Sequence, residues 1–380
     1  MKILFYLGHP AHYHLFRNII SILRSKNHDA TVLIKKKDIL EHLLEQSNLD
    51  FLNILPEGRK DNKFGIALGL LKRDWAMFRL CIKRRPDILV GTSTEITHVG
   101  KLLNVPSIVV NEDDYDAVPL FSKMGYPWAD NILAPVSCPT GLADSNWERK
   151  TIHYEGFHEL AYLHPSRFKP QKNVVEDKID FSKSYIILRF AKLTAHHDKG
   201  KTGITTEIAQ KVIDLLRCRY NIYITSEREL EPEFESYRIQ IDPINMHHAL
   251  YYADMYIGDS QTMAAEAAVL GTPALRFNDF VGNLGYLEEL EHKYGLTYGI
   301  KTTDPGKLYK KIKEFLDTPD LKEEWKARSR KMLSEKIDVA AFITWFIEEY
   351  PRSVAIMKMN PDYQYNFRTE DYIGQEGREN

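Results

Sequence analysis

The sequence predicts an α/β protein with two halves, each a Rossmann-like domain built around a doubly wound parallel sheet. Three observations support this fold class. The chain has 380 residues, which is too long for one ordinary hydrophobic core and indicates two domains. Short apolar runs alternate with segments of helical periodicity in both halves. The stretch Ala253 to Phe277 reads as a buried strand, a tight polar turn, a helix and a second short strand.

The first half opens with an apolar strand and a helix whose apolar residues recur at helical spacing, and this order then repeats. The predicted strands are Lys2–Leu7, Ala30–Lys35, Phe51–Leu55, Ile88–Val90 and Ser107–Val110. The predicted helices are His14–Ser25, Ile39–Gln46, Phe64–Arg84 and Thr97–Leu103. Strands that alternate with helices form parallel sheets, so ligands are expected in the loops beyond the carboxyl ends of the strands.

A change in composition separates the two halves. The segment Gly156 to Ser184 carries prolines and a charged run, which is typical of an inter-domain linker. The predicted elements that follow are the strands Tyr185–Phe190, Ile222–Thr225, Met255–Gly258 and Pro273–Phe277, and the helices Thr205–Cys218 and Met246–Tyr252. We therefore expect domains at residues 1–165 and 180–335, a C-terminal helix at 336–352 that could cross back, and a polar tail at 353–380.

Composition and charge exclude several classes of function. The chain is 43% hydrophobic and 27% charged, as soluble globular proteins are. Its net charge of −2 creates no overall field that favours nucleic acid, so no nucleic-acid partner is expected. The three cysteines fit neither a metal site nor a disulfide framework. No apolar run is long enough for a signal peptide or a membrane span, so we expect a cytoplasmic location.

The turn after the predicted strand Met255 to Gly258 is the strongest candidate for a ligand site. It consists of Asp259, Ser260, Gln261 and Thr262. Unpaired backbone N–H groups and the positive end of the helix dipole would face an anion there, which favours a diphosphate. Glu266 follows about one and a half turns into the helix, where its carboxylate can accept hydrogen bonds from ribose hydroxyls. Together these features describe a nucleotide-sugar site, although many α/β proteins have such a turn and bind nothing there.

Three histidines follow the first strand and are candidates for acid–base chemistry. His9, His12 and His14 lie between this strand and the first helix. Imidazole has a pKa near neutrality, so one of them could take the proton of an acceptor hydroxyl during sugar transfer. Alternatively, the histidines cap the helix or bind phosphate. No carboxylate or cysteine stands at ligand spacing nearby, so no metal is expected.

Two further polar turns lie at predicted carboxyl ends of strands in the first half. Glu112 and Asp113 could bind sugar hydroxyls or act as acid or base. Thr92 and Ser93 could contact the acceptor or the sugar. The alternative for both turns is an ordinary helix cap or a solvated acidic loop.

Cations follow the strand Tyr185 to Phe190 in the second half. Arg189, Lys192 and His196 would offset the charge that develops on the diphosphate of a departing nucleotide. No pair of acidic residues of the kind that binds a divalent metal stands near the expected phosphates. The expected ligand is therefore a nucleotide sugar used as substrate, without a metal or another cofactor.

The segment Arg59 to Arg85 has a charge unlike that of the whole chain. It holds nine basic residues against two acidic ones, together with Trp75 and several other large apolar side chains. A basic amphipathic helix with a Trp fits the surface of an anionic membrane, which would make the protein peripheral to the inner face of the membrane. The alternative is an ordinary surface helix with its apolar face in the core.

Two α/β halves with a phosphate turn in the second resemble the GT-B fold of nucleotide-sugar glycosyltransferases. Pro86 to Asp114 and Ala253 to Leu275 resemble segments of the lipid-linked N-acetylglucosamine transferase of peptidoglycan synthesis. The second segment is equally similar to a motif of the UDP-N-acetylglucosamine 2-epimerases. Closer overall, GHPAHYHLFRNII, YEGFHELAYLHPSRF and GYLEELEHKYGL resemble a GT-B-like family known as domain of unknown function 354, over nearly the whole chain.

The resemblance implies two domains that face a central cleft. Glu266 falls where the transferases have a ribose-binding glutamate, and Ile244 could bracket the base through its backbone. His14 aligns with a histidine of the transferases, which makes it the first choice of catalytic base, before His12. Glu112 resembles a glutamate of the epimerases.

These features lead to the expectation of a glycosyltransferase that passes a sugar from a UDP-sugar to a lipid-linked or glycan acceptor, in surface-glycan or polysaccharide biosynthesis. Two alternatives stay open: a sugar-nucleotide epimerase or hydrolase, and a non-enzymatic protein that binds sugar nucleotides. The glycine-rich loops of the transferases are replaced here by Gly8 to His14 and by Arg189 to Gly203. The resemblance therefore identifies neither the donor nor the residues that bind the acceptor.

Overall fold

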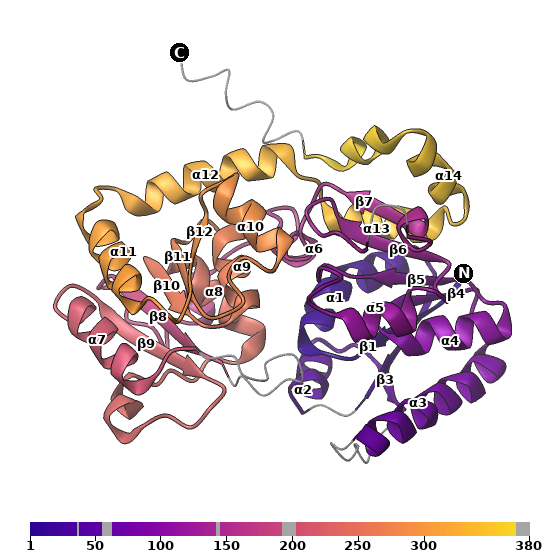
Figure 1. The fold of residues 1–380 in the computed structure, drawn as a ribbon, viewed down its shortest axis with the longest axis horizontal. Helices are drawn as coiled ribbons and strands as arrows, with labels where there is room; N and C mark the ends of the chain where they lie inside the picture. Colours follow the sequence, from indigo (N-terminus) through magenta and orange to yellow (C-terminus); the bar gives the residue numbers. More distant parts are fainter. Residues whose placement is uncertain (36–37, 55–62, 142–144, 192–202, 370–380) are drawn as a thin grey trace. The chain divides into compact units, whose positions relative to one another are not determined.

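The chain folds into two compact units, each with one parallel sheet and surrounding helices (Figure 1). The computed structural model describes residues 1–35, 38–54, 63–141, 145–191 and 203–369. The first unit comprises Met1–Arg167 and Lys336–Thr369, and the second comprises Phe168–Glu335. Two such α/β units are the fold class that the sequence predicts.

The first unit contains a seven-stranded sheet in the order β3-β2-β1-β4-β5-β6-β7, with every neighbouring pair of strands parallel. Its strands are β1 (Lys2–Leu7), β2 (Asp29–Ile34), β3 (Phe51–Asn53), β4 (Ile88–Gly91), β5 (Ser107–Val110), β6 (Asn131–Pro135) and β7 (Thr151–Tyr154). Its α-helices are α1 (Pro10–Ser25), α2 (Asp38–Gln46), α3 (Lys63–Arg84), α4 (Thr94–Leu103), α5 (Pro119–Gly125), α6 (Leu160–Leu163), α13 (Val339–Glu348) and α14 (Arg352–Met359).

The strand β1 shows why this sheet is covered on both faces. Successive side chains of a strand point to opposite faces, and β1 is apolar at every position after Lys2. Tyr6 belongs to a buried cluster with Met77 of α3. Phe5 points to the other face, where its ring lies 5.5 Å from that of Phe16 of α1. Helices therefore shield both faces, as the doubly wound prediction requires.

Two strands of the first sheet were not predicted, and the first helix begins earlier than predicted. The strands β6 and β7 were not predicted, because each is short and no helix of clear period separates them. The first helix begins at Pro10 rather than His14, since proline fits the first position of a helix and His9 acts as the N-cap. His12 and His14 consequently lie within α1 and not in a loop before it.

The second unit contains a five-stranded parallel sheet in the order β12-β11-β10-β8-β9. Its strands are β8 (Tyr185–Phe190), β9 (Asn221–Ser226), β10 (Met255–Gly258), β11 (Ala274–Phe277) and β12 (Thr297–Ile300). Its α-helices are α7 (Thr206–Leu216), α8 (Met246–Tyr252), α9 (Gln261–Val269), α10 (Gly285–His292), α11 (Pro305–Asp317) and α12 (Leu321–Glu335). Buried side chains occupy every position of β10 and β11, as expected for central strands.

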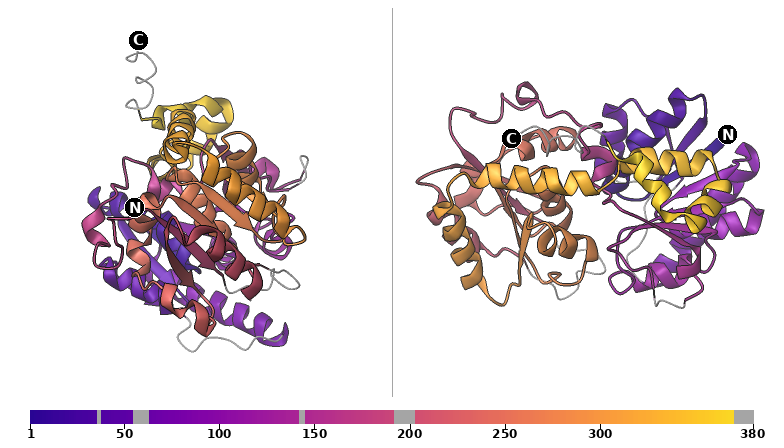
Figure 2. Two further views of the ribbon diagram at one scale, coloured as in Figure 1. Left: turned by 90° about the vertical axis from the view of Figure 1, so that its left-hand side faces the viewer. Right: turned by 90° about the horizontal axis from the view of Figure 1, so that it is seen from above.

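The chain passes between the units twice. The first passage falls inside the predicted linker, between Arg167 and Phe168, and the second falls between Glu335 and Lys336. After the second passage, α13 packs against α1 and α6 of the first unit (Figure 2). The segment predicted as a polar tail also packs there, because the rings of Tyr363 and Phe367 lie 4.7 and 5.4 Å from that of Trp345.

The basic segment predicted at Arg59 to Arg85 forms α3 from Lys63 onward, and residues 55–62 lie outside the described part of the chain. Arg73 does not contribute to an exposed basic surface, because its buried guanidinium is hydrogen-bonded to the carboxylate of Glu95. Among the helices that the described residues form, none has the length and apolar content needed to span a bilayer.

Candidate functional site

The carboxyl edge of the first sheet brings the predicted histidines to the start of α1. The imidazole Nδ1 of His9 accepts a hydrogen bond from the amide of Ala11 at 3.2 Å and so caps the helix. The Nδ1 atom of His12 accepts from the amide of Gly8 at 3.1 Å. A neutral imidazole that accepts at Nδ1 carries its proton on Nε2. Both imidazoles can therefore donate a hydrogen bond from Nε2. A general base needs an unprotonated nitrogen directed at the substrate, so His12 is poorly suited to this role.

His14 has a different environment in the second turn of α1. Its side chain is buried, and its ring lies 5.2 Å from the ring of Tyr162 in α6. The helices α1 and α6 are joined nearby by the Asn18 side chain, whose amide donates to the carbonyl of Ala161 at 2.8 Å. His14 is consequently held by packing against α6, as a positioned acid–base group would need to be.

Glu112 lies just beyond the carboxyl end of β5 and contacts a histidine that the sequence analysis did not select. Its carboxylate accepts a hydrogen bond from the backbone amide of His158 at 3.3 Å, and the His158 Nδ1 atom lies 3.4 Å away. His158 is buried, and its Nε2 atom has no hydrogen-bond partner among the described residues. The sequence signal that could have identified it is its place within YEGFHELAYLHPSRF, far in the chain from Glu112.

Because His158 is buried, we expect the first unit to become less stable at acidic pH. Burial lowers the pKa of His158 to about 4 from its ordinary value near 6.5. Below pH 6.5 the unfolded chain then binds more protons than the folded one, so the free energy of unfolding falls as the pH decreases toward 4. We expect the free energy of unfolding to fall less on acidification in His158→Asn than in the wild type, by up to about 3 kcal/mol. The measurement is urea unfolding of both proteins at about pH 7 and about pH 4.5, with hydrogen exchange of first-unit amides to separate this unit from the second. Equal pH dependence in both proteins would contradict the assignment.

The other residues predicted for this edge of the sheet are Thr92, Ser93 and Asp113. The Thr92 hydroxyl donates to the Val110 carbonyl at 2.6 Å and so joins the ends of β4 and β5. Ser93 is the N-cap residue of α4, and its buried Oγ atom has no hydrogen-bond partner in the described part of the chain. The backbone carbonyl of Asp113 accepts from the Asn111 side chain at 2.8 Å.

The carboxyl edge of the second sheet contains the predicted phosphate turn. Ser260 caps α9 through its hydroxyl, which accepts from the amide of Met263 at 3.4 Å. Asp259 is buried and accepts from the amides of Ala191 and Ile204 at 2.6 and 3.1 Å. Burial raises the pKa of Asp259, and these two backbone amides oppose that rise. The carboxylate thus holds Ala191 and Ile204, the residues near the two ends of the segment 192–202, beside the turn.

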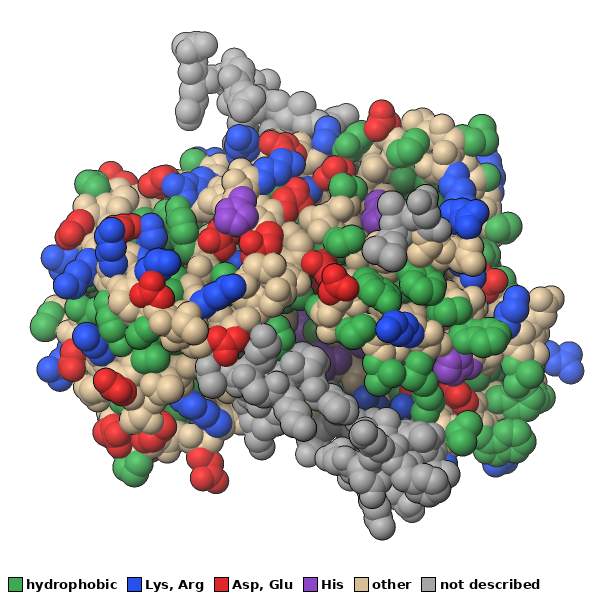
Figure 3. Space-filling view, in the orientation of Figure 1, with side chains coloured by type: hydrophobic (Ala, Val, Ile, Leu, Met, Phe, Trp, Pro, Cys, Tyr) green, Lys and Arg blue, Asp and Glu red, His purple; other side chains and the backbone are tan. Residues whose placement is uncertain are grey.

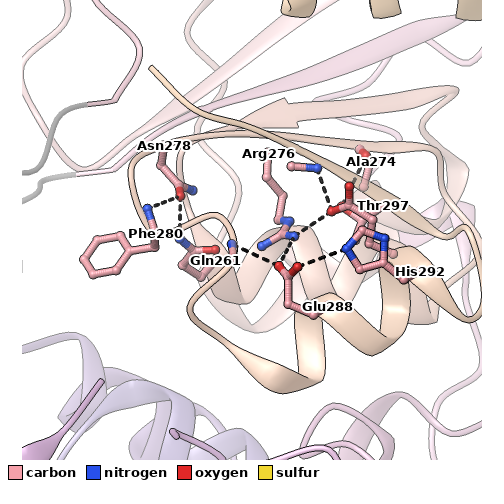
Figure 4. A network of polar contacts seen from close by, with 11 residues as sticks. Gln261, Ala274, Arg276, Asn278, Phe280, Glu288, His292 and Thr297 are labelled. Carbon is pink, nitrogen blue, oxygen red and sulfur yellow. Dashed lines mark hydrogen bonds and ion pairs between the residues drawn. The ribbon is translucent and has the colours of Figure 1, made fainter. Parts of the chain in front are cut away.

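A polar network continues from this turn toward β11 and α10 (Figure 4). The Gln261 side-chain amide donates to Asn278 Oδ1 at 2.7 Å, and the Asn278 amide donates to the Asp259 carbonyl at 3.3 Å. Arg276 is fully buried, and its Nη2 atom lies 3.2 Å from a carboxylate oxygen of Glu288. The same oxygen accepts from the Gly282 amide at 3.1 Å. These contacts hold the β11–α10 loop beside the start of α9, and sequence analysis had not identified them.

Glu266 is buried in α9 and faces α8. Its carboxylate lies 2.9 Å from His247 Nε2. Thr262 is half-buried in the first turn of the same helix. Ile244 is half-buried before α8, and its amide already donates to Asp242 Oδ1 at 3.1 Å. The Ile244 amide is therefore not available to a nucleotide base without a rearrangement.

Arg189 lies near the end of β8, with its side chain directed to β9. Its Nη1 atom donates to the Thr225 hydroxyl at 2.9 Å, and its Nη2 atom is bonded to the Glu227 carboxylate. The predicted partners Lys192 and His196 lie outside the described residues. Each sheet thus collects its predicted polar residues at its carboxyl edge, as parallel α/β folds generally do.

The two parallel-sheet units define a GT-B fold, and solved structures share it. A candidate UDP-N-acetylglucosamine 2-epimerase of Listeria monocytogenes matches with a TM-score of 0.69 and 14% identity, over 93% of this chain and 97% of that one. The epimerase of Neisseria meningitidis bound to UDP-N-acetylglucosamine matches with 0.62 and 14%, over 92% and 99%. The spinosyn rhamnosyltransferase SpnG, in complex with spinosyn aglycone, matches with 0.60 and 14%, over 91% and 100%.

The chain belongs to the family described as protein of unknown function DUF354, whose model matches residues 1–280. An uncharacterised protein of Methanocaldococcus jannaschii is 26% identical over 202 residues. That match covers 50% of this chain, and the chain spans only 57% of the length of this relative. The family was identified correctly from the sequence, and its description names no reaction.

Proposed function

We propose that the protein is a glycosyltransferase that uses a nucleotide-activated sugar, with UDP as the nucleotide. The observation that carries this proposal is the β10–α9 turn. Ser260 caps the helix, and Asp259 and Asn278 fix the turn on both sides. The first backbone N–H groups of a helix have no intrahelical acceptor, so those of Gln261 and Thr262 suit a diphosphate.

The proposed donor site extends from this turn to the neighbouring elements of the second unit. Glu266 would bind the ribose, and the region around Ile244 would contact the base. Arg189, Lys192 and His196 would offset charge on the diphosphate as the sugar leaves. This cationic stabilisation would replace the divalent metal that other transfer reactions need. Neighbours of the same fold support the ligand class, because one is bound to UDP-N-acetylglucosamine.

The acceptor would bind at the carboxyl edge of the first sheet. His14 would remove the proton of the attacking hydroxyl. The side chains placed to contact acceptor or sugar are those of His9, Thr92, Ser93 and Asp113. We propose a lipid-linked or glycan acceptor, with the reaction in the cytoplasm and in surface-glycan or polysaccharide biosynthesis.

A sugar-nucleotide 2-epimerase is the second candidate function, and one contact favours it. Glu112 lies at the end of β5 with its carboxylate bonded to the His158 amide, so it is positioned as an acid or base would be. Several neighbours of the fold are epimerases. Incubation with UDP-N-acetylglucosamine and related UDP-sugars in the absence of acceptor separates the candidates. Epimerised or hydrolysed sugar would favour the epimerase, whereas unchanged sugar with a raised melting temperature would favour a transferase or a non-enzymatic binding protein.

The Glu266 carboxylate provides a direct test of the donor site. We expect Glu266→Ala to weaken UDP-sugar binding by roughly 1–3 kcal/mol, the usual scale for hydrogen bonds to a charged group. Calorimetry or thermal-shift titration would measure this loss. Because Glu266 also contacts His247, the matched control is His247→Asn, which removes that contact and leaves the carboxylate. Unchanged affinity of folded Glu266→Ala, or an equal loss in the control, would exclude ribose recognition by Glu266.

A further inference from the structure

The helix α3 carries two parallel stripes of side chains along its outer face, all of them exposed except Phe78, which is half-buried. The apolar stripe consists of Leu71, Trp75, Phe78 and Ile82. The basic stripe consists of Lys72, Arg79 and Lys83, which follow the same spacing one position later. Residues separated by four, seven and eleven positions share one helix face, so each set forms a continuous line. We call the two lines together the α3 outer face.

Phe78 packs in part against the core of the first unit, whereas the other three residues of the apolar stripe point away from it. The opposite face of α3 supplies the core through Met77 and Cys81, which are buried against β1 and α4. Leu71, Trp75 and Ile82 are 63%, 62% and 53% exposed. A helix that is apolar on its inner face and again on its outer face needs a second partner for the outer one.

Charge around the stripe identifies the kind of partner. Asp74 is the one acidic residue within Leu71 to Arg85, and its carboxylate lies 3.1 Å from His98 Nδ1. The hydrogen bond that His98 donates to the Asp74 carboxylate raises the pKa of the imidazole, so the aspartate charge is directed to α4. Lys72, Arg79 and Lys83 are exposed and make no ion pair with the described residues. The outer face therefore combines apolar and purely cationic side chains; Figure 3 shows both kinds side by side near the C-terminal half of α3.

We propose that the α3 outer face binds the surface of an anionic lipid bilayer. Trp75 and Phe78 stack on each other with ring centroids 5.7 Å apart, and such aromatic side chains suit the interface between headgroups and acyl chains. The three cations lie beside the stripe, where they would meet anionic headgroups. A second copy of the chain fits less well, because two copies of this face would bring their basic stripes together. This inference does not depend on the reaction proposed above.

Sedimentation of the full-length protein with vesicles tests the proposal. Vesicles of phosphatidylcholine with phosphatidylserine should bind the protein at low salt and release it as salt screens the attraction. Vesicles of phosphatidylcholine alone should bind it much less. The triple variant Lys72→Glu, Arg79→Glu, Lys83→Glu should lower the partition coefficient by roughly 100-fold or more. The matched control reverses Lys301, Lys310 and Lys313, which are exposed in the second unit and give the same change of net charge.

A second measurement examines the apolar stripe. Tryptophan fluorescence should shift to shorter wavelength on vesicle binding, and the shift should disappear in Trp75→Phe. Leu71→Ser with Ile82→Ser should weaken binding, whereas Leu120→Ser, an equally exposed leucine on α5, should not. Equal binding by the basic-stripe variant and its control would overturn the proposal. So would wild-type protein that ignores anionic vesicles, or that forms a dimer which the Leu71 and Ile82 substitutions dissociate.

Discussion

Replacing His14 with alanine is expected to lower sugar transfer by roughly 10²–10⁴-fold, the usual contribution of a general base. Donor affinity should hardly change, because His14 belongs to the first unit and the proposed donor site belongs to the second. The measurement is turnover at saturating UDP-sugar, with binding of the donor followed separately by calorimetry. A variant that loses donor binding in parallel would point to a structural effect instead.

The neighbouring histidine serves as the matched control for this prediction. His12 lies one half-turn earlier in α1, and its Nδ1 atom is already bonded to the Gly8 amide. His12→Ala should therefore cost much less turnover than His14→Ala. If His12→Ala has the larger effect, the base is His12. If neither substitution lowers turnover, Glu112 with its contact to His158 becomes the leading candidate.

The sequence was sufficient to predict the strands that are apolar and separated by periodic helices. β1, β8 and β10 begin and end at the predicted residues. β7 was not predicted, because TIHY is only four residues long and its pairing with β6 is decided by tertiary contacts. The first helix began earlier than predicted, because the capping side chain is a histidine and not one of the usual Ser, Thr, Asp or Asn residues.

Contacts between distant parts of the chain explain what the sequence could not predict about the candidate sites. His158 reaches Glu112 across 46 positions, and no local pattern marks that pairing. Asn278 is joined to Gln261 across 17 positions in the same way. Arg73 has the spacing of a surface cation in a basic segment, yet its partner Glu95 is supplied by the next helix.

The buried pair of Arg73 and Glu95 gives the second large expected effect. Arg73→Met should destabilise the first unit by about 3–5 kcal/mol, because it leaves the Glu95 carboxylate buried without its cation. Glu95→Leu alone should cost a similar amount, since it leaves the guanidinium unpaired. The Nη1 atom of Arg73 has no hydrogen-bond partner among the described residues. The contact with Glu95 is therefore the main interaction that offsets the cost of burying the guanidinium charge.

The double variant Arg73→Met, Glu95→Leu distinguishes a buried ion pair from ordinary packing loss. Replacing both charges with apolar side chains is often nearly neutral, so the double variant should recover most of the stability lost in either single one. Hydrogen exchange of the α3 and α4 amides is the suitable measurement, because a chain of two units need not unfold in one step. Lys72→Met, which changes the adjacent exposed cation, should leave exchange almost unchanged. A double variant whose loss equals the sum of the two single losses would show that the charges are not coupled, and that the two side chains stabilise the first unit by independent packing contacts.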